Sequence, residues 1–513
     1  MLKKKVSVVV AAAVLGCSIF GAGVSEVDAA NFGVSYSISS FFKKIKDKVN
    51  NAKQEETTTE AETTQQETTA QEETTVPETT EELTTEDKTE DKTTSTEGTE
   101  KESASTEDAE NGEAATTETT DTETATGETT ATESTAQKEI VTEEETTSNQ
   151  ESLNNANIYN SISYYQEMAG GEAEWLWSQQ MSNGAFAFYN AENGSVYINP
   201  YFSEIVAIAL IGYDSSETAR AKIEDYFDWH FAHINTAEQD YNGLAGTIYD
   251  YDVVVQNGVV VSETSKGSYD STDSYSALFI KALADYAKTY GDKSYLQAHE
   301  SLIKDITNVM FATMSGGYTY AKPDYQIRYL MDNAEVYAGL CAAKYIYGNV
   351  IDDKEMYEKV SNAVAYYDEH FNEHWWKGDH YAAVLNSDNS EYTGYAFSWD
   401  MLYPCAAAQI FPILYGVIDT DSVYAQTVYE GFCNAWDWQD MDYVSEGVTV
   451  FCWGNFAYLG GLMDDEEKLN AYMEKYDDIV DSGRPYPLYS SESAMVLMGC
   501  DEMIRQLENK IVR

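Results

Sequence analysis

The sequence is short of proline, histidine and basic residues. Its 513 residues include 7 prolines, 6 histidines and 31 Lys and Arg, against 88 Asp and Glu, which gives a formal net charge of −57. Scarce proline permits long helices, because proline interrupts a helix wherever it stands in the interior. A chain this acidic repels nucleic acid and anionic membranes, so we expect no nucleic-acid partner.

Motifs for metals, nucleotides and disulfides are also missing. The sequence contains no C-x-x-C pair, no Walker loop and no dinucleotide fingerprint, and the stretch from His370 to His374 lacks the spacing of a zinc helix. Beyond Cys17, the cysteines are odd in number, widely spaced and set in apolar contexts, which predicts buried free thiols. They are Cys341, Cys405, Cys433, Cys452 and Cys500. We therefore predict no metal site and no cofactor.

The first 29 residues have the features of a secretory signal peptide. Three lysines are followed by an apolar stretch from Val6 to Val24 and by small residues for cleavage after Ala29. Two alternatives stay open: the stretch remains uncleaved as a membrane anchor, or Cys17 is lipidated within a loose lipobox. In each case the predicted location is secreted or extracellular.

Composition then divides the rest of the chain into three parts. Residues 30–53 form a short basic segment. Residues 54–150 hold 30 acidic and 4 basic residues among many threonines, so this part cannot bury apolar surface and is expected to be a disordered, extended linker. Residues 151–513, with 55 acidic and 19 basic residues, have the composition of a packed domain. The extended linker of residues 54–150 would also suit a protein that is associated with a cell surface.

Two kinds of helix alternate from residue 151 onward. Amphipathic helices, such as Asp352–Phe371, carry a single apolar stripe, whereas others are apolar nearly all round and must be enclosed. The six enclosed helices are predicted at Phe202–Gly212, Ser271–Ala287, Asp332–Tyr347, Leu402–Tyr415, Gly454–Leu462 and Ser490–Gly499. This alternation predicts an all-α fold, the (α/α)6 toroid. One exception is Val253–Ser262, where Asn257-Gly258 separates two β-branched runs and predicts a hairpin.

The chain resembles the six-hairpin glycosidase superfamily. The similarity lies in Tyr269–Leu283 (YDSTDSYSALFIKAL), which is followed by the turn Gly291-Asp292, and in Asn199–Leu210 (NPYFSEIVAIAL). The latter is similar to the acid-bearing first inner helix of family 8 endoglucanases, although the Gly-rich motif that follows the glutamate there is missing. The resemblance spans roughly Glu172 to Gly499 and implies the toroid fold and action on glycosidic bonds.

Carboxylates at the starts of the enclosed helices are the candidate catalytic residues, because glycoside hydrolysis needs an acid and a second carboxylate as base or nucleophile. The candidates are Glu204, Asp270, Asp273, Asp332 and Glu335. We predict Asp273 or Asp332 as the base and Glu204 or Glu335 as the acid. The alternative is structural, since Asp270 with Asp273, and Asp332 with Glu335, also have the spacing of helix caps. Asp400 and Glu492, which open two further helices, are reserves.

Aromatic residues near the same helix starts are the candidate substrate-binding residues. They are Tyr201, Tyr269, Tyr275, Trp399, Tyr403, Trp453 and Tyr486, within a total of 40 Tyr and 9 Trp. Sugar rings present C–H faces that stack on aromatic rings, but each of these side chains also suits ordinary core packing.

The sequence therefore predicts a secreted, monomeric glycoside hydrolase with a carbohydrate substrate. One alternative is a non-catalytic surface protein that binds glycan or cell wall. Another is a polysaccharide lyase on the same fold, although the acidic domain suits anionic chains poorly. A stretch at Trp175–Phe188 is also similar to terpene-cyclase and prenyltransferase repeats, but the predicted export argues against that activity.

Overall fold

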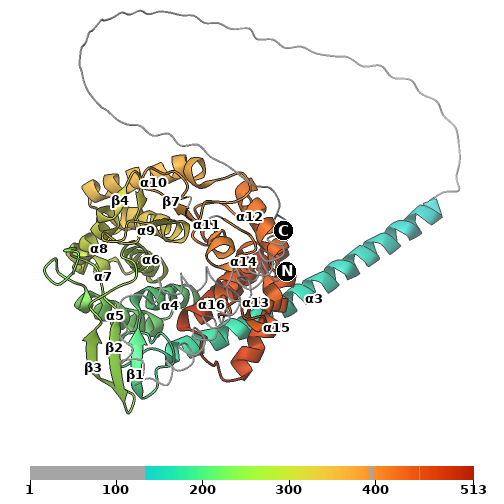
Figure 1. Ribbon diagram of the computed structural model, residues 1–513. Helices are drawn as coiled ribbons and strands as arrows, with labels where there is room; N and C mark the ends of the chain where they lie inside the picture. The colour runs from blue at the N-terminus through green and yellow to red at the C-terminus, as the bar shows by residue number, and fades with distance from the viewer. Residues whose placement is uncertain (1–132, 393, 395–396, 450, 513) are drawn as a thin grey trace, which may run out of the picture. The chain divides into compact units, whose positions relative to one another are not determined.

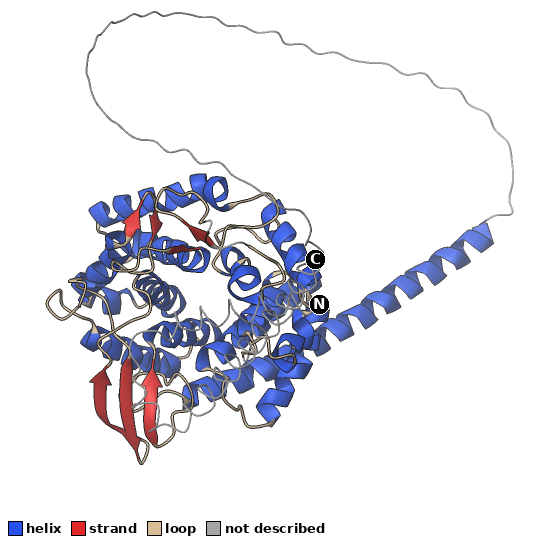
Figure 2. Ribbon diagram, viewed as in Figure 1, coloured by secondary structure: helices blue, strands red, loops and turns tan. Residues whose placement is uncertain are grey.

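The computed structural model describes residues 133–392, 394, 397–449 and 451–512, and most of this part of the chain is helical (Figures 1 and 2). The predicted signal peptide, the basic segment 30–53, Cys17 and the linker up to residue 132 lie outside the described residues. Among the residues described, none of the helices is both long enough and apolar enough to span a membrane.

Six inner elements form a closed ring in the described part of the chain (Figure 1). Each packs against the next, and the last packs against the first. They are α4 (Pro200–Tyr213), α6 (Asp273–Tyr290), α9 (Leu330–Asn349), α11 (Phe411–Leu414), α14 (Gly454–Leu462) and α16 (Ser490–Val512). In α4 every residue from Ser203 to Ile211 is buried, as expected for an enclosed helix.

Outer helices connect successive inner elements and bury one face each. They are α3 (Glu133–Ser178), α5 (Glu217–His233), α7 (Lys293–Ala298), α8 (Glu300–Ala312), α10 (Lys354–Trp375), α12 (Val423–Ala435) and α15 (Glu466–Asp481). In α10 the buried residues include Met356, Val360, Val364 and Phe371, the stripe that the sequence predicts. The short α13 (Asp442–Ser445) and the 3-10 turn η3 (Trp438–Asp440) lie between α12 and α14. The predicted alternation of enclosed and amphipathic helices is therefore confirmed.

Helix α3 begins earlier than predicted. It starts at Glu133, so residues 133–150 are helical although the sequence analysis places them in the disordered linker. This stretch has no proline or glycine, and its Glu, Gln, Lys and Ala residues favour a helix that continues into the domain.

The fourth inner element is broken, which corrects the prediction of one helix over Leu402–Tyr415. A π-helical turn, η2 (Leu402–Ala406), contains Tyr403 with extended backbone angles, and α11 follows after a gap and is only four residues long. Pro404 and Pro412 explain the break, because a proline supplies no N–H and its ring clashes with the preceding turn.

Short strands also correct the all-α expectation. Strands β1 (Gly194–Ile198), β2 (Tyr251–Gln256) and β3 (Val259–Ser265) form an antiparallel sheet in the order β1-β2-β3. The predicted hairpin is confirmed, since Asn257 and Gly258 join β2 to β3 with φ angles of 51° and 74°. Two-stranded pairs join β4 (Met314–Ser315) to β5 (Tyr318–Thr319), and β6 (Arg328–Tyr329) to β7 (Val384–Leu385). All of these strands lie in connections between helices.

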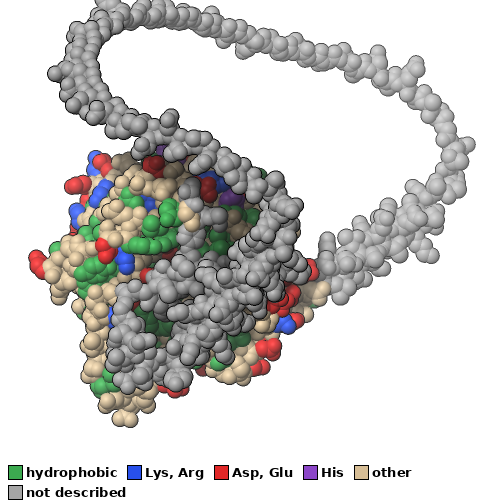
Figure 3. All heavy atoms as spheres, viewed as in Figure 1, with side chains coloured by type: hydrophobic (Ala, Val, Ile, Leu, Met, Phe, Trp, Pro, Cys, Tyr) green, Lys and Arg blue, Asp and Glu red, His purple; other side chains and the backbone are tan. Residues whose placement is uncertain are grey.

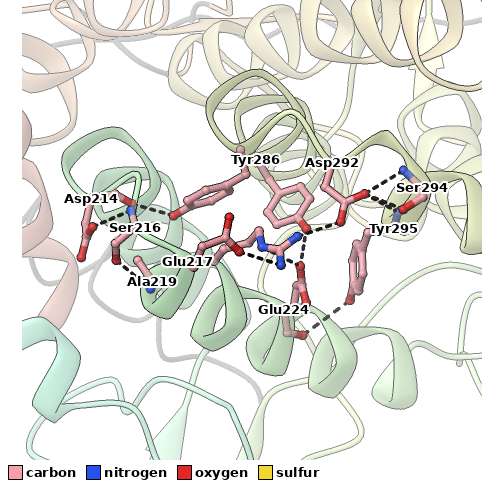
Figure 4. Close-up of polar contacts among 11 residues, drawn as sticks. Asp214, Ser216, Glu217, Ala219, Glu224, Tyr286, Asp292, Ser294 and Tyr295 are labelled. Carbon is pink, nitrogen blue, oxygen red and sulfur yellow. Dashed lines mark hydrogen bonds and ion pairs between the residues drawn. The ribbon is translucent and has the colours of Figure 1, made fainter.

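A polar network joins α5 to the end of α6 and the start of α7 (Figure 4). Helix α6 ends at Gly291 with a φ of 71°, and Asp292 then caps α7 by accepting from the backbone N–H of Ser294. Arg220 of α5 contacts the Asp292 carboxylate at 3.0 Å.

The sequence prediction of buried free thiols is confirmed for Cys405, Cys452 and Cys500. Cys341 and Cys433 are also free but only partly buried. On the visible face, acidic side chains lie around the periphery with Lys and Arg beside several of them (Figure 3).

Candidate active site

The first turns of three adjacent inner helices bring the candidate carboxylates together. Asp273 begins α6, Asp332 and Glu335 lie in the first two turns of α9, and Tyr201 begins α4. The hydroxyl of Tyr201 donates a hydrogen bond of 2.6 Å to Glu335, and the ring of Tyr201 stacks on Tyr275 at 5.8 Å. These contacts show that the three helix starts meet at one end of the ring.

Asp273 is completely buried at the start of α6. Its Oδ1 accepts from the Ser271 hydroxyl at 2.6 Å and from the Ser274 N–H at 2.9 Å. Burial raises the pKa of Asp273 to about 6, although these hydrogen bonds favour the ionised form and oppose the rise. The helix N-cap is Thr272, which makes no side-chain cap, and Asp270 makes no hydrogen bond with the start of α6 among the described residues. The simple capping alternative therefore does not describe this pair.

Asp332 and Glu335 differ in exposure. Asp332 is half-buried, whereas Glu335 is 1% exposed and held by Tyr201. Burial raises the pKa of Asp332 well above its ordinary range, and the nearby carboxylates of Asp273, Glu335 and Asp270 raise it further. Burial also raises the pKa of Glu335 to about 7. Helix α9 begins at Leu330 with no side-chain cap at Tyr329, so the capping-box alternative is not what is observed here either.

Asp270 is exposed to solvent, yet protein atoms enclose it enough to raise its pKa to about 6. The ammonium group of Lys322 opposes this rise, because a nearby positive charge favours the ionised carboxylate. Asp270 and Asp332 are therefore the two members of this cluster that combine solvent contact with partial enclosure. We call Asp270, Asp273, Asp332 and Glu335 the carboxylate cluster.

Glu204 lies apart from solvent, one turn further into α4. It is completely buried, and neither carboxylate oxygen has a hydrogen-bond partner among the described residues. The buried His230 lies close by, with its Nδ1 3.7 Å from Oε1. Burial, and secondarily the charge of Glu335, raises the pKa of Glu204 well above its ordinary range. Burial therefore favours the protonated form of Glu204.

Three of the predicted aromatic residues adjoin the carboxylate cluster. Tyr201 contacts Glu335 directly, and Tyr269 immediately precedes Asp270. Tyr275 is buried behind Tyr201, where its hydroxyl is bound by Asn199 and donates to Asp250 at 3.1 Å. The buried ring of Tyr275 therefore packs against the ring of Tyr201 and helps to hold it in place.

The other four predicted aromatics lie in the fourth inner element or in the segments that precede it, α14 and α16. Tyr403 lies 5.5 Å from Trp453, which stacks on Phe456 of α14. Trp399 packs against Gly431 of α12, and Tyr486 packs edge-on against Tyr189 at 5.5 Å. The role of these four side chains in substrate binding stays a prediction. Asp400 is exposed beside Trp399, and Glu492 is buried against Gly454.

Sequence reasoning missed Asp250, which lies beside the cluster. Its buried carboxylate accepts from Tyr197 at 2.6 Å and from Tyr275, and burial raises its pKa to about 7. Asp250 precedes β2 rather than a helix, so the search for carboxylates at helix starts could not find it. Among the described residues, no group of three or more His, Cys, Asp or Glu side chains is arranged to hold a metal ion.

Comparisons with known proteins were made for the whole chain. No family model matches, and no curated protein matches. The chain is similar to the solved structure of a glycosidase, with 13% identity, a TM-score of 0.46, and coverage of 67% of this chain and 98% of that one. It is also similar to an α-amylase from Clostridium perfringens (10% identity, 66% and 97% coverage, TM-score 0.41). A third match is a cold-adapted family 8 xylanase (10% identity, 66% and 90% coverage, TM-score 0.44).

These matches are to glycosidases, the class that the sequence resemblance names. Because the identities and TM-scores are this low, the function proposed below rests on the carboxylate cluster and its surroundings.

Proposed function

We propose that the protein is a glycoside hydrolase that acts on a neutral poly- or oligosaccharide by paired-carboxylate catalysis. The single observation that carries this proposal is the carboxylate cluster, in which two carboxyl groups with solvent contact have pKa values raised by different surroundings. Burial raises the pKa of Asp270, and burial together with neighbouring carboxylates raises that of Asp332. Glycosidic bonds are cleaved by one protonated and one ionised carboxyl group, and such an arrangement separates the two roles.

Asp332 is the proposed general acid. Its pKa is raised well above the ordinary range by burial and by three neighbouring carboxylates, so it holds its proton to higher pH than an ordinary aspartic acid. It is half-buried and can therefore contact a bound substrate. The proton of Asp332 passes to the glycosidic oxygen as the bond to the anomeric carbon breaks. Glu335 and Asp273 act through Asp332, because their negative charges hold that proton in place.

Asp270 is the proposed second carboxylate. Its pKa of about 6 and the neighbouring Lys322 keep it ionised at neutral pH, so it serves as base toward water or as nucleophile. Glu204, predicted from sequence as an acid, has no solvent contact that would let it reach substrate, which favours Asp332 for that role.

The proposal is tested by measuring reducing-end release by the full chain from a panel of neutral and acidic polysaccharides. Wild type should release reducing ends from at least one neutral substrate, and Asp332→Asn and Asp270→Asn should lower kcat at least 100-fold. Glu358→Gln is the matched control, because Glu358 is an exposed carboxylate on the outer helix α10. Full activity in both site variants would contradict the proposed roles. Silence of the wild type on every polysaccharide, with oligosaccharide binding retained, would favour the glycan-binding alternative.

We also propose that the protein is exported and stays associated with the cell surface through its N-terminal region. The sequence features at residues 1–29 and the acidic Thr-rich linker support this proposal. Cell fractionation and N-terminal sequencing of the mature protein test it. A new N-terminus near residue 30, outside the cytoplasm, is expected. A cytoplasmic protein that still starts at Met1 would contradict export.

A further inference from the structure

The loop that precedes β2 presents a tyrosine to solvent beside the carboxylate cluster. Tyr241 is 46% exposed, and its ring is stacked with Tyr269 at a centroid distance of 4.9 Å and an interplanar angle of 27°. Tyr249 lies parallel to Tyr241 at 6.1 Å. Tyr269 immediately precedes Asp270. The exposed ring of Tyr241 therefore stacks directly on the residue before a proposed catalytic carboxylate.

This loop is held in a fixed shape by its own hydrogen bonds. The carboxylate of Asp240 accepts from the backbone N–H groups of Asn242 and Leu244 at 2.9 Å, and from the hydroxyl of Thr247 at 2.9 Å. Gly246 has a φ of +93°, and a Cβ placed there would lie 2.5 Å from the backbone of Asp305 on α8. The loop is therefore packed closely on α8, and Tyr241 is presented without a large ordering cost on binding.

A second loop, which leads into α9, meets the first beside Asp270. The side-chain amide of Asn242 donates to the Tyr269 hydroxyl at 3.0 Å and to Asp324 at 3.2 Å. The next residue, Tyr325, is 41% exposed, and Lys322 of the same loop binds the carbonyl oxygen of Tyr269 at 3.4 Å. The two exposed tyrosines thus come from two loops that are joined by a hydrogen bond. Its donor, Asn242, is next to Tyr241 in the sequence, and its acceptor, Asp324, is next to Tyr325.

We propose that Tyr241, together with Asn242, Asp324 and Tyr325, forms a sugar-binding subsite for a neutral oligosaccharide on the Asp270 side of the carboxylate cluster. The inference deepens the proposed function and rests on it for the orientation of the chain being cleaved. Sugar rings stack their C–H faces on tyrosine, and the amide and carboxylate bind sugar hydroxyl groups. The acidic groups around the subsite disfavour uronic acid chains, because like charges repel.

A single exposed tyrosine is common on any protein surface and signifies little. Tyr159 of α3 is an example, since it is 56% exposed and lies far in sequence from both loops. What distinguishes Tyr241 is its stacking on Tyr269, its hydrogen-bonded loop, and the hydrogen bond from the adjacent Asn242 to Asp324 in the second loop. Tyr159 therefore provides the matched control for a loss of exposed aromatic surface.

The test is calorimetric titration of the full-length chain with xylohexaose, cellohexaose and maltohexaose. The Asp332→Asn variant is used, because removal of the proposed general acid should stop cleavage and leave binding. At least one hexasaccharide should bind, and adding Tyr241→Ala should weaken its binding about tenfold or more. Tyr241→Phe keeps the ring and should retain most of the affinity, whereas Tyr159→Ala should leave affinity unchanged. In the active chain, Tyr241→Ala should raise KM for the hexasaccharide by a larger factor than it raises KM for the shortest accepted substrate.

Unchanged affinity in Tyr241→Ala would overturn the subsite, and so would the failure of all three hexasaccharides to bind. The two proposals fail differently. Binding that depends on Tyr241 in a wild-type chain that cleaves nothing would contradict the hydrolase and keep the subsite. Cleavage whose KM does not change in Tyr241→Ala would contradict the subsite and keep the hydrolase.

Discussion

At the residue scale, the chemistry follows from the crowding of carboxylates. Asp270, Asp273, Asp332 and Glu335 come from two helix starts, and four negative charges in so small a partly enclosed space cannot all persist. Asp332 faces the other three, so its proton is the most strongly held. The exposed Asp270 has Lys322 beside it and ionises more readily. Asp332 and Asp270 are the same type of residue, so their positions within the cluster decide which one acts as the general acid.

The pH profile of kcat/KM should be bell-shaped. The base Asp270 must be ionised, so activity should fall as the pH drops through about 6. The acid Asp332 must be protonated, so activity should also fall at high pH, on the far side of its raised pKa. Initial rates at low substrate concentration from pH 4 to 10 measure both limbs. A profile that stays flat down to pH 4 would contradict the role of Asp270.

The sequence predicted the members of the cluster, but it assigned Asp332 to the bases, whereas the proposed function makes Asp332 the acid and Asp270 the base. Asp270, Asp273, Asp332 and Glu335 could be chosen because a helix that is enclosed on all sides places its first residues at the mouth of a ring. The burial of Glu204 could not be foreseen, since one turn of helix separates it from Tyr201 and only packing reveals which of the two reaches solvent. Asp250 gave no signal at all, because its neighbours predict a strand.

At the scale of elements, the ring depends on close approach between inner helices. A Cβ at Gly339 of α9 would lie 2.6 Å from the Cα of Ala277 on α6. These helices carry Asp332 and Asp273, so the same crossing sets the spacing of the cluster. The sequence predicted the two enclosed helices that meet at this crossing. It did not predict the break at Pro404 and Pro412, although those prolines are the physical cause of it.

Gly339→Val should destabilise the domain by about 1–3 kcal/mol, because the larger side chain forces α6 and α9 apart. Gly212→Ala is the control, since Gly212 lies in α4 with nothing within 4 Å of an added Cβ. There, alanine should leave stability unchanged or raise it by up to about 1 kcal/mol. Urea unfolding of both variants gives the comparison. Equal effects of the two substitutions would mean that the α6–α9 crossing tolerates added volume.

At the scale of the whole molecule, carboxyl groups with raised pKa values should lower the free energy of unfolding at neutral and alkaline pH. Burial raises the pKa of Asp270 and Asp273 to about 6, and that of Glu335, Asp250 and Glu492 to about 7. The folded protein therefore binds more protons than the unfolded chain between pH about 4 and about 7. Stability from these groups is complete below the lower limit and is lost as the pH rises through the upper one.

The melting temperature of the full chain should therefore fall by several degrees between pH 5 and pH 8. Asp270→Asn should melt higher than wild type at pH 8, where it removes one negative charge from the cluster, and should show a smaller difference at pH 5, where Asp270 is largely protonated. Scanning calorimetry at both pH values measures this. A lower melting temperature for the variant at pH 8 would show that the Asp270 carboxylate stabilises the fold.

The central claim is that Asp332 supplies the proton that releases the leaving group, and dependence on the leaving group tests it most directly. Wild type and Asp332→Asn are compared on a natural oligosaccharide and on an aryl glycoside of the same sugar whose phenol leaves without protonation. The variant should lose at least 100-fold on the oligosaccharide and far less on the aryl glycoside, whereas Asp270→Asn should lose activity on both. Equal losses by Asp332→Asn on the two substrates would contradict the assignment.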